Sequence, residues 1–182
     1  MAVRKILLYP QDEARLRRKS AEIKRVDNEV KALITDLKDT LATQAGAGLA
    51  APQIGVYKRV ALVRFGQDKG EIQPPIALIN PVIVESGEVG TGFDGCLSMP
   101  GWVTWDTIRP TWLTFRARDE NWKKIEMRVE GIDSIVVHHE IDHLNGVLFL
   151  DRMAKGGKLW IEETDENGEK HLVELSKALP KL

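Results

Sequence analysis

The segment His139-Glu140-Ile141-Asp142-His143 constrains this chain more than any other. Two histidines four positions apart on a helix differ by about 40° around its axis, so both imidazoles can reach one metal ion. Glu140 lies close enough on the same arc to reach a water bound to that ion. The pattern H-E-x-x-H therefore predicts metal-activated water, with a carboxylate to accept its proton.

The helix that carries this pattern is predicted to begin near Asp133, as its N-cap, and to end near Asn145, with Gly146 just beyond it. Its apolar positions and the motif residues fall on one stripe: Ile132, Ile135, Val136, His139, Glu140 and His143. Such a stripe should face the core, where polar groups are costly unless something satisfies them, as a metal ion does. The alternative is a core helix with two histidines hydrogen-bonded to other protein groups.

A catalytic metal site needs a third protein ligand and one open position. Metallopeptidases with a longer motif take that ligand six residues after the second histidine, but here this position is Phe149. Cys96, the only cysteine, is the best candidate, although a lone buried cysteine is more often a small hydrophobic residue. A Cys-His-His set completed by water is tetrahedral and suits zinc or ferrous iron.

The composition is typical of a globular protein with one domain, spanning residues 1–182. Apolar residues make up 43% and charged residues 29%, and the net charge of −1 argues against specific nucleic-acid binding. No apolar run reaches the roughly 18 residues of a membrane span. A single cysteine excludes an internal disulfide, which favours a reducing, cytoplasmic setting.

The rest of the pattern predicts a first helix over residues 27–46 and six strands. The apolar residues of that helix recur at helical spacing: Val30, Leu33, Ile34, Leu37 and Leu41. The predicted strands are 60–65, 76–85, 112–118, 124–129, 159–163 and 170–175. The last four strands are predicted to form two hairpins. Pro81 predicts a break or an edge in the second strand, and residues 46–53 are expected to be a loop.

Three segments together resemble the peptide deformylase family: Gly46-Ala47-Gly48-Leu49-Ala50-Ala51-Pro52-Gln53, Gly95-Cys96-Leu97-Ser98 and His139-Glu140-Ile141-Asp142-His143-Leu144-Asn145-Gly146. Their order and spacing fit as well, and the likeness runs from about Ile6 to Arg152. The resemblance implies an α+β fold in which mostly antiparallel strands pack around a central metal-binding helix.

The resemblance also implies a role for each site residue. Cys96, His139 and His143 would bind the metal, which is ferrous iron in the native bacterial enzymes and often zinc or nickel after isolation. Glu140 would be the general acid and base. Gln53 and the backbone N–H of Leu97 would hold the formyl oxygen, and preorganised donors there stabilise the developing charge. Without the resemblance, Gln53 could also be an exposed glutamine after a proline.

The implied substrate is the N-formyl group of a nascent chain that begins with formylmethionine, and the products are formate and a free methionine. The carbonyl of Gly48 would accept the peptide N–H, and Ile132, Ile135 and Val136 would line the methionine pocket. Ala47, smaller than the usual branched residue, would widen the mouth of that pocket. A transient contact with the ribosome is an expected partner interaction.

Several positions depart from the family pattern. Asp94 replaces a glutamate and is one methylene shorter, and His138 replaces a glutamine but lies about 100° from His139, so it is not counted as a ligand. The segment around Trp102 and Val103 lacks an arginine that many relatives carry, and Arg109 follows a few residues later. The C-terminus is predicted to be a hairpin followed by a short basic tail at residues 177–182.

Two other functions share the same motifs. Another metal-dependent amidase or peptidase would use the same ions, and would show no preference for formylated peptides. A structural metal module would need a fourth protein ligand, for which His171 or a carboxylate remains, and it would leave Glu140 without a purpose.

Overall fold

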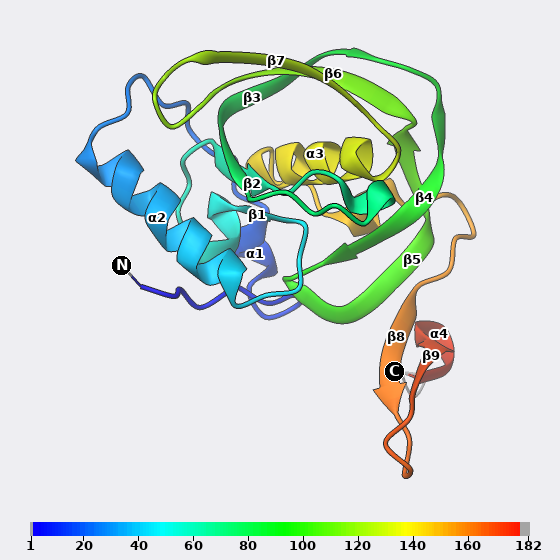
Figure 1. Ribbon diagram of the computed structural model, residues 1–182. Coiled ribbons are helices and arrows are strands. Elements are labelled where there is room, and N and C mark those ends of the chain that lie inside the picture. The colour runs from blue at the N-terminus through cyan, green and yellow to red at the C-terminus, as the bar shows by residue number, and fades with distance from the viewer. Residues whose placement is uncertain (1, 179–182) are drawn as a thin grey trace.

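The computed structural model describes residues 2–178, and its strands form two antiparallel sheets (Figure 1). The larger sheet has the order β1-β2-β3-β6-β7, with strands at Gly48–Ala50, Val60–Val63, Ile76–Ser86, Trp112–Arg118 and Lys124–Glu130. The smaller has the order β4-β5-β8-β9, at Val89–Cys96, Met99–Pro110, Trp160–Thr164 and Lys170–Glu174. The helices are α1 (Glu13–Leu16), α2 (Asn28–Ala42), α3 (Gly131–Leu144) and α4 (Leu175–Ala178). Within residues 2–178, none of them is long and apolar enough to span a membrane.

Helix α3 runs through the middle of the molecule, with the larger sheet curved around it and the β4–β5 hairpin on its other side (Figure 1). Its buried residues Val137 and Ile141 pack in one apolar cluster with Phe115 and Val129 of the larger sheet. Residues of the opposite face, including the two motif histidines, are also buried. The predicted α+β fold around a central helix is therefore confirmed.

The start of α3 differs from the prediction. The helix begins at Gly131 without a side-chain cap, and Asp133 lies inside its first turn. The Asp133 carboxylate instead accepts a hydrogen bond of 3.0 Å from the backbone N–H of Gly66, which ties the helix to the loop after β2. The predicted end is confirmed, because Asn145 is the C-cap and Gly146 follows in the left-handed region at φ 75°.

The predicted apolar stripe faces the core over only half of its length. His139, Glu140 and His143 are buried, as expected, but Ile132 is 37% exposed, and Ile135 and Val136 are half-buried. The first turns of α3 therefore border an open cleft, and the last turns enter the interior.

Helix α2 confirms its predicted start and apolar face, although it ends earlier than predicted. Asp27 caps it by accepting a hydrogen bond from the N–H of Val30, and its predicted apolar residues are all buried. It ends at Ala42 and not at Gly46. The Arg64 side chain donates to the carbonyl groups of Leu41 and Gly46 at 3.2 and 3.0 Å, and so links the end of α2 and the segment after it to the residue directly after β2.

Strand pairing confirms the middle of the predicted pattern and corrects two parts of it. β6 and β7 form the expected hairpin, and β3 breaks at the expected place, since the register shifts between Ile79 and Val82 around Pro81. The expected loop at residues 46–53 contains a short strand, β1, which pairs with β2. The β4–β5 hairpin was not predicted, although it forms the most extensive part of the smaller sheet.

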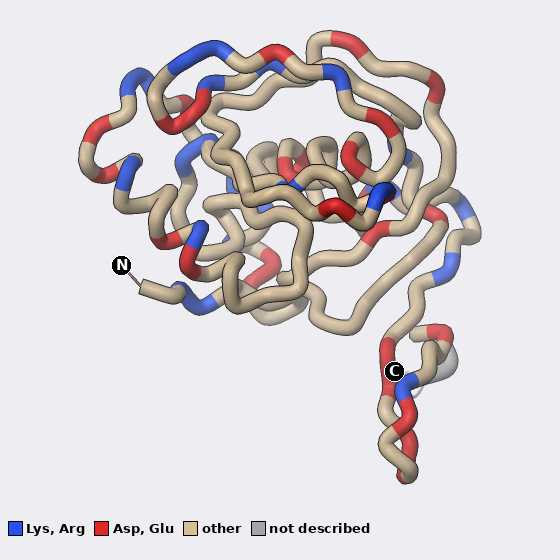
Figure 2. Tube along the Cα trace, viewed as in Figure 1, with Lys and Arg blue, Asp and Glu red and all other residues tan. Residues whose placement is uncertain are grey.

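The predicted C-terminal hairpin is present as β8 and β9, and it projects away from the rest of the molecule (Figure 1). It joins the smaller sheet through two residue pairs with β5, Trp102 with Ile161 and Val103 with Trp160. Acidic residues outnumber basic ones along it (Figure 2). Helix α4 follows it, and residues 179–182 of the predicted basic tail lie outside the described part of the chain.

We expect Phe115→Ala to lower the free energy of unfolding by about 3–5 kcal/mol. Phe115 is fully buried in the larger sheet, and its ring stacks on Phe65 with centroids 6.4 Å apart, so truncation leaves a cavity under α3. Urea unfolding followed by tryptophan fluorescence measures the loss. Val84→Ala, at a position of β3 that is 42% exposed, is the control and should stay within about 0.5 kcal/mol of the wild type. Equal losses in the two variants would contradict this account.

Candidate metal centre and catalytic cleft

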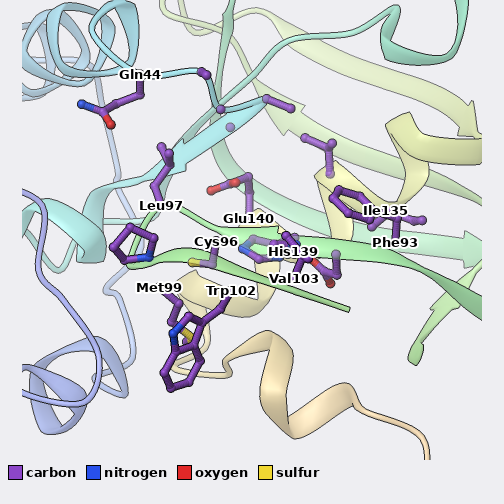
Figure 3. Close-up of a pocket in the computed structure, with 18 of the residues that line it drawn as sticks. Gln44, Phe93, Cys96, Leu97, Met99, Trp102, Val103, Ile135, His139 and Glu140 are labelled. Carbon is purple, nitrogen blue, oxygen red and sulfur yellow. Dashed lines mark hydrogen bonds and ion pairs between the residues drawn. The ribbon is translucent and has the colours of Figure 1, made fainter. Parts of the chain in front are cut away.

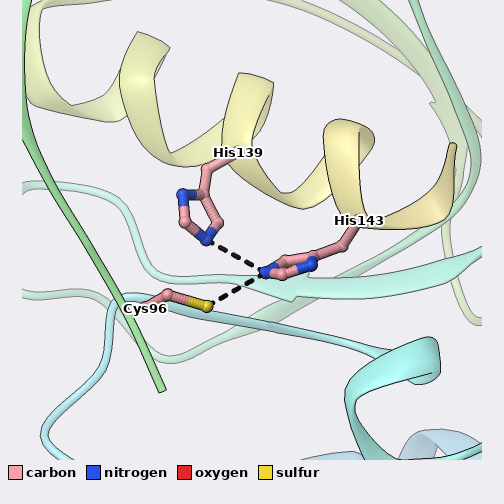
Figure 4. A group of neighbouring side chains, drawn as sticks. All are labelled: Cys96, His139 and His143. Carbon is pink, nitrogen blue, oxygen red and sulfur yellow. Dashed lines mark hydrogen bonds between the residues drawn. The ribbon is translucent and has the colours of Figure 1, made fainter. Parts of the chain in front are cut away.

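Three potential metal ligands converge beside α3 (Figure 4). Cys96 ends β4, immediately before the two-residue turn into β5, and the two histidines occupy successive turns of α3. Cys96 Sγ lies 3.2 Å from His143 Nε2, which lies 3.1 Å from His139 Nε2. The three ligand atoms all lie within 4.8 Å of one another. The structure thus brings together residues 43 and 47 positions apart in the sequence.

Asp94 orients His139 from behind. Its Oδ1 lies 2.7 Å from His139 Nδ1, so this nitrogen donates to the carboxylate and Nε2 faces the cluster. A carboxylate on the far nitrogen of a histidine is the usual support of a metal ligand. One thiol and two imidazoles also suit a borderline-soft divalent ion. The residues present therefore fit a metal ion. Asp94 reaches His139 although its side chain is one methylene shorter than the glutamate that the family usually has at this position.

Asp94 belongs to a buried chain of ion pairs. Its Oδ2 accepts hydrogen bonds from Nε and Nη2 of Arg109 at 2.9 and 2.7 Å, and Nη1 of Arg109 donates to Asp142. Arg152 also donates to Asp142, at 2.7 and 3.0 Å. Burial would raise the pKa of Asp94, but His139 and Arg109 outweigh it and hold that pKa well below its ordinary value. Arg109 is 2% exposed and supports the metal site, so it cannot take the place of a substrate-binding arginine at the surface.

His138 lies outside the ligand cluster, as expected. Its Nδ1 is 3.2 Å from Nη1 of Arg109 and its Nε2 is 4.0 Å from Asp142. Burial lowers the pKa of His138 to about 4, so the ring is neutral near pH 7 and its Nδ1 can accept a hydrogen bond from Arg109. Histidine at position 138, where the family usually has glutamine, therefore provides an additional hydrogen-bond acceptor for the Arg109 side chain.

The charge state of Cys96 suits a ligand. Burial would raise the pKa of its thiol, but the neighbouring imidazoles of His143 and His139 lower it to about 5. The thiolate form, which binds metals, is therefore favoured at neutral pH.

Glu140 is enclosed beside this cluster. It is 4% exposed, its Oε2 has no hydrogen-bond partner among the described residues, and burial raises the pKa of its carboxyl to about 7. Gly48 of β1 makes room for it, because a Cβ at Gly48 would lie 2.3 Å from Glu140 Oε1. A group that titrates near neutral pH suits general acid–base chemistry.

Gln53 is 1% exposed, so the alternative of a surface glutamine is wrong. Its Oε1 accepts a hydrogen bond of 2.8 Å from the N–H of Ala50. Its Nε2 therefore points away from β1, toward Ser98 Oγ at 3.2 Å and Cys96 Sγ at 3.6 Å. A fixed amide donor thus lies beside the sulfur.

An open cleft of about 630 Å³ leads to these groups (Figure 3). Two chain segments, residues 44–48 and 100–103, line it from different parts of the chain, and Phe93, Gly95 and Leu97 complete the lining on the β4–β5 hairpin. The predicted pocket residues of α3 line it as well: Ile132, Ile135 and Val136. The structure therefore brings every predicted binding residue to one cleft, including Ala47 and Gly48.

Sequence reasoning missed Ser98, Asp142 and Arg152. The available signal for Asp142 was a charged residue in the last turns of a helix expected to be buried, where a partner is required. The partner of Ser98, Gln53, is 45 positions away, which no local pattern indicates.

We expect Gly48→Ala to lower the free energy of unfolding by about 1–3 kcal/mol, because the new Cβ forces the buried Glu140 side chain to move. The control is Gly90→Ala in β4, where the nearest atom to a Cβ, Thr111 Cγ2, lies at an ordinary 3.7 Å. This control should be neutral or slightly stabilising, since alanine restricts the unfolded chain. Urea unfolding compares the two, and an equal change in both would show that Glu140 is not confined by Gly48.

Comparisons with known proteins identify the family. The family profile of polypeptide deformylase matches residues 3–159. The chain is 42% identical over 170 residues to a peptide deformylase of Thermomicrobium roseum, covering 91% of this chain and 95% of the relative. It is 38% identical over 155 residues to peptide deformylase 1 of Bacillus subtilis, covering 85% and 92%.

Solved structures agree with these sequence matches. A peptide deformylase from Legionella pneumophila superimposes with a TM-score of 0.73 at 39% identity, covering 84% of this chain and 87% of the other. The peptide deformylase from Ehrlichia chaffeensis in complex with actinonin gives a TM-score of 0.76 at 32% identity, covering 86% and 91%. The resemblance inferred from the three motifs is confirmed, and the chain belongs to the peptide deformylase family of metal-dependent hydrolases.

Proposed function

We propose that this chain removes the formyl group from N-formylmethionine at the start of nascent polypeptides, by the site residues described above. Hydrolysis of N-formyl peptides is the activity of its family. The observation that carries the assignment of the site is the convergence of a thiolate and two imidazoles beside a buried, unpartnered carboxylate, at the inner end of an open cleft.

Cys96, His139 and His143 would hold the metal ion. We propose ferrous iron as the native ion, with zinc or nickel as possible replacements after isolation, since one thiolate and two imidazoles suit each of these. When bound, the ion supplies Lewis-acid activation of water and of the formyl carbonyl.

Glu140 is the proposed general acid and base. Its carboxylate accepts a proton from the attacking water and returns it to the nitrogen of the leaving amine, so one group serves both steps. The elevated pKa of Glu140 supports this role, because a group that titrates near 7 can take up and release a proton at neutral pH.

Gln53 and Leu97 are the proposed donors to the formyl oxygen, which becomes negative as the carbon turns tetrahedral. The fixed Nε2 of Gln53 supports its assignment, and Leu97 lies in the turn directly after the ligand Cys96. Each preorganised donor of this kind contributes about 2.7–4 kcal/mol to the transition state.

The methionine side chain is proposed to lie against α3, where Ile135 and Val136 line the cleft and Ile132 lies at its more exposed end. The carbonyl of Gly48 would accept the peptide N–H, and Ala47 would leave a wider mouth. A flexible apolar side chain suits a pocket of this kind.

The two alternatives have less support. A structural module needs a fourth ligand, but the compact group contains three among residues 2–178, and His171 is exposed on the projecting hairpin. A metallopeptidase or another amidase remains compatible with the ligand set. Formate release from formyl-Met peptides, compared with acetate release from acetylated ones, separates it from the deformylase.

The setting of the reaction is also a proposal. The single cysteine is consistent with a reducing cytoplasm, and a formylated start exists on new chains, which favours a transient contact with the ribosome. Residues 1–182 are proposed to act as one catalytic domain, supported by the match of the family profile to residues 3–159.

We expect Glu140→Gln to reduce kcat by about 10²–10⁴-fold, because the amide cannot carry the proton between water and amine. Metal content should be unchanged, since Glu140 lies outside the ligand group. The assay is formate release from a formyl-Met peptide with ferrous iron and without oxygen, alongside metal analysis. Wild-type turnover in the metal-loaded variant would exclude the proposed role.

We expect Cys96→Ser to weaken metal binding by more than about 100-fold, because loss of a supporting residue around a ligand already costs about 10–100-fold. The hydroxyl that replaces the thiolate is a harder and less acidic group. Metal content after dialysis against a chelator, compared with the wild type and with Ser98→Ala as the neighbouring control, measures the effect. Equal retention in Cys96→Ser and the wild type would remove Cys96 from the ligand set.

A further inference from the structure

We propose that Phe93 and Trp105 form a binding site for an apolar side chain that follows the formylmethionine in the substrate, an inference that rests on the proposed function. Both rings are large, apolar and unusually open to solvent, at 46% and 48% exposure. They contact each other with ring centroids 5.4 Å apart and planes inclined by 59°. Neither ring belongs to the apolar clusters that form the core of residues 2–178.

The pair is continuous with the catalytic cleft. Phe93 lines the same cavity as Glu140 and His139 and lies beside Ile135, on the opposite side of the metal site from Leu97 (Figure 3). With the formyl group at the metal site and the methionine against α3, the remaining peptide has to leave the cleft along its walls. Phe93 is part of one of these walls, and Trp105 extends the wall onto the surface.

A bulge in the hairpin brings the two rings together. Gly92 pairs with Thr107 and Asp94 pairs with Thr104, so β5 has one more residue than β4 over this stretch. A bulge re-aims the side chains next to it, and bulges are frequent beside active sites. Here the extra residue sets Trp105 against Phe93.

Neighbouring contacts hold the bulge in place. Asp106 accepts a hydrogen bond of 2.8 Å from the N–H of Lys158, and its carbonyl accepts one of 2.7 Å from the N–H of Ala154. Thr104 donates to the carbonyl of Lys158 at 2.7 Å. The segment after α3 therefore anchors the strand on both sides of Trp105, so the aromatic pair is a preformed surface.

The charges of the cleft favour an apolar ligand at this surface. The ionisable side chains among the lining residues are Asp94, Cys96, His139 and Glu140, and all of them belong to the metal site. The outer lining consists of uncharged side chains, including Val103 and Trp102. Aromatic surfaces bind aliphatic or aromatic side chains through contact area and ring geometry, so a leucine or phenylalanine fits this site better than a serine.

The volume of the cleft agrees with this extension. At about 630 Å³ it lies within the range of roughly 300–1,000 Å³ that accommodates a drug-sized ligand, which is larger than one amino-acid residue. The cleft can therefore hold the first residue and part of the next ones, with Phe93 in its lining and Trp105 in contact with Phe93 beyond it.

Two series of formylated tripeptides test the proposal: formyl-Met-Xaa-Ser and formyl-Met-Ser-Xaa, in which Xaa is serine, leucine or phenylalanine. For the iron-loaded wild-type protein we expect leucine and phenylalanine to raise kcat/KM by about 3–10-fold over serine in at least one series. The gain should come from KM, since Phe93 and Trp105 contact the bound peptide and not the reacting atoms.

Substitutions of the two aromatic residues test whether they cause this preference. Trp105→Ala and Phe93→Ala should abolish the preference for leucine and phenylalanine, and Trp105→Phe should keep it. Val89→Ala is the matched control, because Val89 lies at the other end of β4, is 68% exposed and is not part of the cleft lining. It should retain the full preference.

The outcomes separate this proposal from the proposed function. Equal kcat/KM for all peptides in the wild type would overturn the aromatic site and leave deformylation intact, and so would a preference that persists in both alanine variants. Formate release from none of the peptides would instead overturn the proposed function. If one alanine variant does not fold, the other alanine variant and the wild-type peptide series still decide the question.

Discussion

The buried series of ion pairs from His139 through Asp94 and Arg109 to Asp142 joins the two parts of the candidate metal site. His139 and Asp142 belong to α3, Asp94 belongs to β4 and Arg109 to β5. Since Cys96 lies two residues after Asp94, the position of the hairpin against the helix determines how far the sulfur lies from the imidazoles. These ion pairs hold the β4–β5 hairpin against α3, and so keep Cys96 close to the two histidines.

These charges are costly to bury, and the structure reduces the cost by pairing each of them. The side chains of Arg109, Asp94 and Asp142 are exposed by only 1%, 3% and 4%, and an ion in such a position loses several kcal/mol of hydration. Arg109 lies between the two carboxylates, and Arg152 supplies a second cation to Asp142. Buried pairs of this kind add little net stability, but they restrict geometry, which is what a metal site requires.

The sequence alone predicts those parts whose signals are local. Helix α2, the β6–β7 hairpin and the end of α3 follow from spacing, capping and turn residues within a few positions. The ligand candidates follow from short motifs combined in one chain. The partners of Arg109 are not predictable in this way, because they lie 15 and 33 positions away and no local pattern connects them.

The β4–β5 hairpin escaped prediction for a reason that is connected with its function. Glycine weakens a strand pattern, and β4 contains three, Gly90, Gly92 and Gly95. Yet a Cβ at Gly92 would lie 2.6 Å from Ile135 Cδ1, so glycine lets the strand lie close to the helix that carries the histidines without displacing the end of the Ile135 side chain. Gly48 does the same for Glu140 on the opposite wall. Gly92 and Gly48, which weaken the strand pattern in the sequence, are therefore also the residues that let the backbone lie close to α3 and to Glu140 around one cleft.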